Sequence, residues 1–406
     1  MKTAAIIAEY NPFHNGHAYQ ISELRNKHGV THVIAIMNAS FMQRGGPAIF
    51  DKLQRCNAAL QCGADLVLEL PYVYGAQTAE IFAYGGVGIA ALCSADILSF
   101  GCETPELAAF HKIVPLLRHE NTEYRQSLRQ YLNDGFSYAQ SRIKSLEQLS
   151  GSDLAFLKLP NNILALEYLR AIDRIGQPLP VIPIPRKGIA YYETGVNNGY
   201  ASASFLRSEL SDGNLKSVQS AVPYPLEFSA KELAKHLHSS DDYRFPIKAA
   251  LLDTKKLSVL PDYETGMENR FAQSLPFLND GVETFVAQVS TKRYTKSRIR
   301  RMLFNLLMDY TAEDMFFYRD HLPGYLRILG TNHKGRELIN QIKATHRVLA
   351  VSNLSKEIEQ FSAEDRKIAQ TERKASALFH LYDDSYCDDY SLKPIIRDES
   401  HGDISC

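Results

Sequence analysis

The feature that most constrains this chain is a regular alternation, over its first 210 residues, of short apolar runs and longer amphipathic stretches. Short runs rich in Ile, Val and Leu are typical of buried strands, and the longer stretches have the spacing of surface helices. Strand-then-helix repetition predicts an α/β fold, a Rossmann-like parallel sheet whose strands end along one ligand-binding edge. The expected strands are residues 4–9, 32–37, 66–70, 97–100 and 181–184, and the expected helices are residues 16–27, 51–62, 78–92 and 106–117.

The rest of the chain has a different pattern. Residues 120–175 have a helical period and predict an insertion before the last strand. The segment Val222-Pro223-Tyr224-Pro225 interrupts the pattern and predicts a boundary between a first domain, residues 1–221, and a second, residues 222–406. We expect the second domain to be mainly helical, with a polar, acidic and poorly ordered tail at residues 383–406.

Composition excludes several classes of protein. With 406 residues, 45% apolar and 22% charged, the chain is expected to be globular and to contain at least two domains. Its apolar runs fall well short of the roughly 20 residues that cross a membrane, and Glu9 interrupts the first run too early for a signal peptide. We therefore expect a cytoplasmic protein. Six cysteines without a CxxC pair predict no metal site, and the sequence leaves the oligomeric state open.

A histidine motif follows the first expected strand and opens the first helix. It reads Glu9-Tyr10-Asn11-Pro12-Phe13-His14-Asn15-Gly16-His17. Free N–H groups at a helix start favour a phosphate, and Gly16 allows close approach of the backbone. His14 and His17 share a helix face and can both donate to one α-phosphate during in-line attack, with pyrophosphate leaving. The motif predicts nucleotidyl transfer with these two catalytic histidines, against the alternative of a simple helix cap.

Three neighbouring features are less specific. Glu9 ends a buried strand, so we expect it to cap a backbone N–H or to position a ligand rather than to act as a general base. The loop at residues 43–47 is interpreted equally well as a contact for nucleotide or RNA and as a plain surface turn. Asp51, Lys52 and Arg55 begin the next helix, and we interpret them as its solvated face.

The histidine motif resembles the HxGH signature of the nucleotidylyltransferase superfamily. That superfamily also has a late ISSTxIR-like segment over the triphosphate, which Ser202-Ala203-Ser204-Phe205-Leu206-Arg207 resembles, with Ala203 in place of one hydroxyl. Two hydroxyls and an arginine at a helix start are suited to β- and γ-phosphates.

Further segments, Phe41-Met42-Gln43-Arg44-Gly45, Leu68-Glu69-Leu70-Pro71-Tyr72 and Pro160-Asn161-Asn162-Ile163-Leu164, extend the resemblance to the bacterial tRNA(Met) cytidine acetate ligase family. The resemblance implies that ATP, with Mg²⁺ on its phosphates, activates acetate as acetyl-adenylate. The acetyl group then passes to the wobble cytidine of elongator tRNA(Met), which gives N4-acetylcytidine. The implied nucleotide site, with the ISSTxIR-like residues, is Ile7, Ala8, Glu9, Tyr10, Asn11, Pro12, Phe13, His14, Asn15, Gly16, His17, Ala18, Tyr19, Gln20, Gly101, Asn161, Asn162, Arg186, Lys187, Ser202, Ser204 and Arg207.

Several of these positions also make physical sense alone. Gly101 ends a strand at the ligand edge and leaves room for adenine or ribose. Asn161 and Asn162 begin a helix, where a capping role and a nucleotide contact are equally favoured. Arg186 and Lys187 follow the last strand, and a basic pair there favours phosphate over a solvated loop. The sequence does not decide which of the two contacts ATP.

A basic segment in the second half is the candidate RNA surface. Residues 291–301 carry six Lys or Arg side chains and no acid, in a chain whose net charge is −1. Basic residues interleaved with an aromatic ring suit an RNA backbone, and the alternative is a solvated helix face. The expected contacts are Lys292, Arg293, Tyr294, Lys296 and Arg298, extended by Arg327, His333, Lys334 and Arg336.

Two other functions share the histidine motif. A small-metabolite nucleotidyltransferase would make a coenzyme precursor and release pyrophosphate without RNA. A nucleotide-sensing or RNA-binding protein would keep the fold without turnover, although both histidines and Gly16 are present. Dependence on tRNA separates the acetate ligase from the metabolite enzyme.

Overall fold

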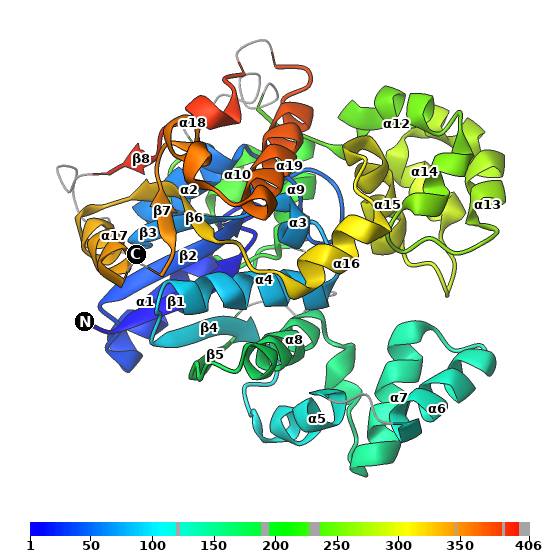
Figure 1. The fold of residues 1–406 in the computed structure, drawn as a ribbon, viewed down its shortest axis with the longest axis horizontal. Coiled ribbons are helices and arrows are strands. Elements are labelled where there is room, and N and C mark those ends of the chain that lie inside the picture. Colours follow the sequence, from blue (N-terminus) through cyan, green and yellow to red (C-terminus); the bar gives the residue numbers. More distant parts are fainter. Residues whose placement is uncertain (119–121, 188–194, 227–235, 346, 384–385, 398–406) are drawn as a thin grey trace.

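A single eight-stranded sheet runs through the centre of the protein (Figure 1). The computed structural model describes residues 1–118, 122–187, 195–226, 236–345, 347–383 and 386–397. The strands lie in the order β5-β4-β1-β2-β3-β6-β7, and β8 pairs with β6. They are β1 (Thr3–Ala8), β2 (His32–Asn38), β3 (Leu66–Leu70), β4 (Ile97–Cys102), β5 (Val181–Pro185), β6 (Tyr325–Thr331), β7 (Leu349–Val351) and β8 (Ile395–Ile396).

The predicted first half is confirmed. All five expected strands are present, and β1 to β5 are parallel neighbours in the sheet. The helices between them are α1 (Asn15–His28), α2 (Lys52–Gln61), α3 (Tyr72–Gly75), α4 (Ala79–Leu92), α5 (Ala108–Arg118) and α8 (Pro160–Ile175). The expected insertion contains α6 (Thr122–Asn133) and α7 (Tyr138–Ser150), which with α5 form a lobe at the lower right of Figure 1.

Both faces of the sheet are buried. Ala5 and Ile7 of β1 belong to one apolar core, and Ala4 and Ile6 belong to the other, because successive side chains of a strand point to opposite faces. A sheet covered on both sides explains why its strands are continuous apolar runs instead of alternating ones. The carboxyl ends of the parallel strands β1, β4 and β5 therefore meet at one edge, beside the start of α1.

The second half is largely helical, as expected, but it also completes the sheet. Its helices are α9 (Ala203–Ser211), α10 (Leu215–Gln219), α12 (Arg244–Ala250), α13 (Met267–Ser274), α14 (Val282–Val289), α15 (Lys296–Met308), α16 (Ala312–Asp320), α17 (His333–Thr345), α18 (Leu354–Glu357) and α19 (Ala363–Phe379). Helices α12 to α15 form a second lobe at the upper right of Figure 1. In the described part of the chain, no helix is long and apolar enough to cross a bilayer.

Strand β6 was not predicted from the sequence. It lies antiparallel to β3, with Leu66 opposite Thr331, and β7 lies parallel to β6. Every residue of β6 is buried, including Arg327, which donates to the carbonyl oxygens of Asp389 and Leu392. The expectation that Arg327 extends a basic surface is therefore wrong.

A buried charge cluster joins the two halves of the chain. Lys52, 1% exposed, lies with its Nζ 2.7 Å from Glu69 Oε1 and 3.8 Å from Glu372 Oε1, and it is also paired with Asp389. Burial alone lowers the pKa of Lys52, but the three carboxylates outweigh it and raise that pKa. The interpretation of Lys52 and Arg55 as a solvated helix face is wrong, since both side chains are buried.

The described part of the acidic tail is packed on the protein. Asp389 is fully buried in the charge cluster, and β8 pairs with β6. The expectation of a poorly ordered tail does not hold for residues 386–397, and residues 398–406 lie outside the described part. Within this segment, Asp389 is an ion-pair partner of the buried Lys52.

Removing the charge of Lys52 is expected to destabilise the protein strongly. A Lys52→Met substitution removes the cation from a buried cluster of acids in which burial already raises the pKa of Glu69 and of Glu372, and breaking such a cluster costs about 3–5 kcal/mol. The free energy of unfolding from urea denaturation measures the loss. Lys256→Met, at an exposed position, is the control and is expected to stay within about 0.5 kcal/mol of the wild type. Equal stability of the two variants would contradict the role assigned to the cluster.

Candidate active site

The two histidines of the motif cap the first helix with their own rings. His14 is the N-cap of α1, and its Nδ1 accepts from Gly16 N at 3.0 Å. His17 Nδ1 accepts from His14 N at 3.2 Å, which completes a reciprocal capping box. A ring nitrogen that accepts a backbone N–H carries no proton, so in each neutral ring the proton is on Nε2. The cap therefore determines the tautomer and leaves both Nε2–H groups as donors.

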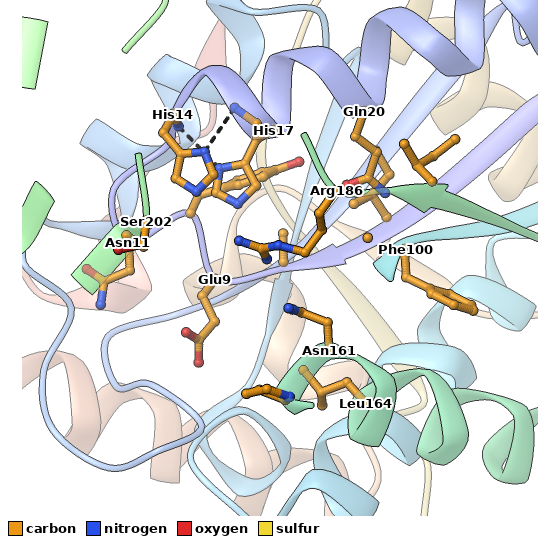
Figure 2. Close-up of a pocket in the computed structure, with 18 of the residues that line it drawn as sticks. Glu9, Asn11, His14, His17, Gln20, Phe100, Asn161, Leu164, Arg186 and Ser202 are labelled. Atoms are coloured by element: carbon orange, nitrogen blue, oxygen red, sulfur yellow. Dashed lines mark hydrogen bonds between the residues drawn. The ribbon is translucent and has the colours of Figure 1, made fainter. Parts of the chain in front are cut away.

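Both rings are held neutral. They stack with centroids 3.8 Å apart. Burial, then the Arg186 guanidinium, lowers the pKa of His14 to about 3. Burial, then His14 and Arg186, lowers the pKa of His17 well below its ordinary value. At neutral pH the pair supplies oriented N–H dipoles, and Arg186 supplies the positive charge (Figure 2).

Gly16 is needed because of the His14 ring. A Cβ at this position would lie 2.9 Å from His14 Cε1, closer than real contacts allow. The turn is also tied down from outside. Asn15 donates from Nδ2 to Gly199 O at 2.8 Å, and Arg207 donates from Nη1 to Asn11 O at 2.8 Å. The residue type at position 16 is thus explained by the cap, independently of any ligand.

A cavity of about 280 Å³ opens beside the two rings. It lies at the carboxyl edge of β1, β4 and β5, where the parallel sheet predicts a ligand site. Figure 2 shows the histidines on one wall and Asn161 and Leu164 of α8 on the opposite side. The predicted residues that line it are Ile7, Ala8, Glu9, Tyr10, Asn11, His14, Gly16, His17, Tyr19, Gln20, Gly101, Asn161, Arg186, Lys187, Ser202, Ser204 and Arg207.

Five predicted residues are not part of the lining: Pro12, Phe13, Asn15, Ala18 and Asn162. Phe13 is buried against Tyr10 and His17. Asn162 is also fully buried, and its Oδ1 accepts from the backbone N–H groups of Glu103 and Thr104, each at 3.1 Å. Its Nδ2 donates to Phe156 O at 2.9 Å. Asn162 thus holds the loop after β4 and does not cap α8, whose N-cap is Leu159.

Cations surround the cavity. Arg44, the adjacent pair Arg186 and Lys187, and Arg207 line it from three separate segments. Arg186 reaches toward the histidine rings, whereas Lys187 Nζ lies 4.0 Å from the centroid of the Tyr19 ring. Arg186 is thus the one of the pair that approaches the predicted α-phosphate position. A ring of cations with neutral donors between them suits a polyphosphate.

The ISSTxIR-like segment forms the start of α9. Ser202 is its N-cap and accepts from Phe205 N at 3.2 Å, and its Oγ lies 3.1 Å from Ser204 Oγ. Ser202, Ser204 and Arg207 all line the cavity, so the predicted hydroxyls and guanidinium are brought together at a helix N-terminus.

Sequence reasoning missed an apolar part of the lining: Phe82, Phe100, Leu164, Tyr168 and Tyr200. One signal for them was available. Asn161, Leu164 and Tyr168 have helical spacing, so they share a face of α8 once its start is placed. No comparable pattern marks Phe82 and Phe100, because an apolar residue of a buried helix or strand is expected in the core whether or not it also lines a cavity.

Buried Arg55 stabilises the carboxyl edge of the sheet through hydrogen bonds. Its guanidinium and Nε donate to the carbonyl oxygens of Phe50 at 3.0 Å, Glu9 at 2.8 Å and Asn38 at 2.9 Å, and also to Ala39 O. Above it, Glu9 Oε1 accepts from Gln43 N at 2.8 Å. The expectation that Glu9 caps a backbone N–H is confirmed.

The basic segment is largely neutralised by acids that are distant in sequence. Glu264 pairs with Arg293 and Arg298, and Arg298 also lies 5.0 Å from the Tyr294 ring centroid. Lys292 and Lys296 are exposed, with no ion pair to a described residue. Gly45 of the loop that lines the cavity packs on α15, since a Cβ there would lie 2.6 Å from Arg300 Cβ. The expected RNA contacts are therefore reduced in charge, and the helix that carries Lys296 and Arg298 contacts the loop beside the site through Arg300.

The lowered pKa of His14 predicts a pH dependence of stability. The unfolded chain binds a proton near pH 6.5 and the folded one near pH 3, so stability is complete above pH 6.5 and is lost as pH falls below it. Between pH 7.5 and pH 5.5, the free energy of unfolding of His14→Gln should fall by about 1 kcal/mol less than that of the wild type. Unfolding in urea at both values measures this, with exposed His111→Gln as the control. Parallel pH profiles of His14→Gln and the wild type would contradict it.

Comparison with known proteins agrees with this geometry. The sequence profile of the family described as HIGH Nucleotidyl Transferase matches residues 1–392. The tRNA(Met) cytidine acetate ligase of Thermoanaerobacter sp. is 34% identical over 371 residues, which are 89% of this chain and 91% of the relative. That of Clostridium kluyveri is 34% identical over 375 residues, 88% of this chain and 90% of the relative.

Solved structures have the same fold. Thermotoga maritima TmcAL without ligand superposes with a TM-score of 0.89 at 26% identity, covering 98% of this chain and 100% of that one. The same protein bound with alpha-thio ATP gives 0.87 at 25% identity, with the same coverage. The chain therefore belongs to the HIGH nucleotidyl transferase family and, within it, to the tRNA(Met) cytidine acetate ligases.

Proposed function

We propose that this protein is an ATP-dependent ligase that activates acetate as acetyl-adenylate and transfers the acetyl group to the wobble cytidine of elongator tRNA(Met), in the cytoplasm. The observation that carries the proposal is the capping box of His14 and His17, which aims two neutral N–H donors into a cavity surrounded by cations. The relatives named for this activity, and the TmcAL structure bound with alpha-thio ATP, support it.

The first step needs little covalent help from the protein. An acetate oxygen attacks the α-phosphorus, a new P–O bond forms, and the bond to pyrophosphate breaks. Negative charge then grows on the α-phosphate oxygens and on the leaving group. Donors that are already oriented stabilise that charge without rearranging, which is the largest contribution such a site makes. His14 and His17 supply donors at the α-phosphate, and Arg207 with the α9 hydroxyls is suited to the β- and γ-phosphates.

Mg²⁺ is expected to arrive with the nucleotide. Among the described residues no group of three His, Cys, Asp or Glu side chains is placed to hold a metal ion. The phosphates themselves would then be the main ligands of the ion, as is usual for Mg²⁺ with nucleotides.

Substitution of either histidine tests the site. His14→Ala and His17→Ala are each expected to lower acetate-dependent pyrophosphate–ATP exchange about 100-fold or more, because an oriented donor at the α-phosphate is lost. His111→Ala, on the exposed side of α5, is the control. Exchange at the wild-type rate in either folded active-site variant would exclude the proposed catalytic role.

The proposed substrates are tested with the wild-type protein. Incubation with ATP, acetate and total bacterial tRNA, followed by mass analysis of the nucleosides, should yield N4-acetylcytidine. Turnover that ignores both acetate and tRNA would instead favour a small-metabolite nucleotidyltransferase.

The two unpaired lysines test the RNA surface. Lys292→Glu with Lys296→Glu is expected to weaken tRNA binding at least 10-fold in low salt and to reduce its salt dependence, because phosphate contacts release counterions. Fluorescence anisotropy with labelled tRNA at several salt concentrations measures this. Lys343→Glu with Lys356→Glu, also exposed, is the charge-matched control. Equal affinities of the two double variants would move the RNA surface elsewhere.

A further inference from the structure

Glu9 is out of keeping with the rest of the cavity. Among the described residues that line the cavity it is the only carboxylate, and the charged side chains around it are Arg44, Arg186, Lys187 and Arg207. A fixed negative charge attracts neither acetate nor the phosphates, and it can only receive hydrogen bonds, from a ribose hydroxyl, an adenine amine or the amine of the acceptor base. The carboxylate therefore points to a part of the reaction that brings in a hydrogen-bond donor.

Hydrogen bonds fix the backbone carbonyl of Glu9 and one of its two carboxylate oxygens. The carbonyl oxygen of Glu9 accepts from buried Arg55 at 2.8 Å, and Oε1 accepts from Gln43 N at 2.8 Å. Oε2 receives no hydrogen bond from a described residue. Figure 2 shows the side chain of Glu9 directed away from the histidine rings. One oxygen is thus anchored, and the other is left without a described hydrogen-bond donor in a residue that lines the cavity.

We propose that Glu9 Oε2 accepts a hydrogen bond from the exocyclic amine of the acceptor cytosine and takes its proton as the acetyl group is transferred, a general-base role that was not expected from the sequence. The inference rests on the proposed function, which supplies the amine and the acetyl-adenylate. A carboxylate is the side chain that matches the N4–H₂ group of cytosine. The unpaired base of an anticodon loop can be placed in a pocket at little cost, because it is not held in a duplex.

The step balances without another reactant. The N4 lone pair attacks the carbonyl carbon of acetyl-adenylate, and a C–N bond forms. The C–O bond to the phosphate breaks, and AMP leaves with that electron pair. One N4 proton passes to Glu9. The amine of cytosine is a weak nucleophile, since its lone pair is delocalised into the ring, so removal of its proton during attack matters more than for an alkyl amine.

Glu9→Gln separates this role from the first step. Glutamine retains an oxygen for the Gln43 N–H but cannot take a proton. Acetyl transfer to tRNA from synthetic acetyl-adenylate, which bypasses activation, should fall about 100-fold or more. Acetate-dependent pyrophosphate exchange should fall less than about 10-fold. Glu106→Gln, at an exposed position, is the matched control.

The pH profile supplies a readout that a structural role would not move. The pH profile of transfer by Glu9→Gln should differ in shape from that of the wild type, whereas a purely structural role would lower transfer equally at every pH. The titratable and charged groups around Glu9 are Tyr10, His14, His17, Arg44, Arg55 on α2, Tyr168 on α8, Arg186, Lys187 and Arg207. Each of them is unchanged in Glu9→Gln, so a difference in shape belongs to the carboxylate.

The contrary outcomes are distinct. Equal losses in exchange and transfer would overturn the inference and assign Glu9 to nucleotide or metal binding. Unchanged transfer would overturn it as well. Failure of the wild-type protein to acetylate tRNA from either donor would instead remove the proposed function.

Discussion

The guanidinium of Arg55, buried in the first turns of α2, is the contact on which the active edge depends. It donates to carbonyl groups at the ends of β1 and β2 and in the segment before α2. Carbonyls just past the end of a strand have left the ladder, and buried ones need a donor. A planar group with five N–H donors meets several of them at once. Burial lowers the pKa of Arg55 to about 10, and the group still remains charged at neutral pH. The chain can therefore turn sharply after Ala8 and begin α1 a few residues later.

The site combines neutral histidines with basic side chains, and the packing explains this combination. The histidines are neutral because they are enclosed and because Arg186 lies beside them. Their orientation comes from two backbone N–H groups, which are present before any ligand arrives. Basic side chains from three segments, Arg44, Arg186 with Lys187, and Arg207, supply the positive charge. A phosphate would thus enter a site whose dipoles and charges are already in place.

The sequence predicted the parts of the structure that depend on local pattern. Buried parallel strands show as apolar runs, and His14, Gly16 and His17 lie in one short turn whose chemistry is local. The errors concern residues whose environment is made by distant segments. Lys52 and Arg55 are polar in sequence but buried in the fold, because Glu69, Glu372, Asp389 and a set of carbonyls receive them. Strand β6 was missed for the related reason that its partner, β3, lies far back in the chain. The side chain of Asn162 was undecided, because a cap and a ligand contact use the same residue type at a helix start.

The place of β6 in the sheet has a consequence for how the protein is made. During synthesis β1 to β5 emerge early, but the edge of β3 stays without its neighbour until Thr331 has left the ribosome. An uncovered strand edge can pair wrongly, so this interval is one of exposure to misfolding. Lys52 lacks one of its carboxylate partners for longer still, since Asp389 is among the last described residues. A ribosome stalled shortly before that point would carry a chain with both catalytic histidines but with one carboxylate partner of the buried Lys52 still missing.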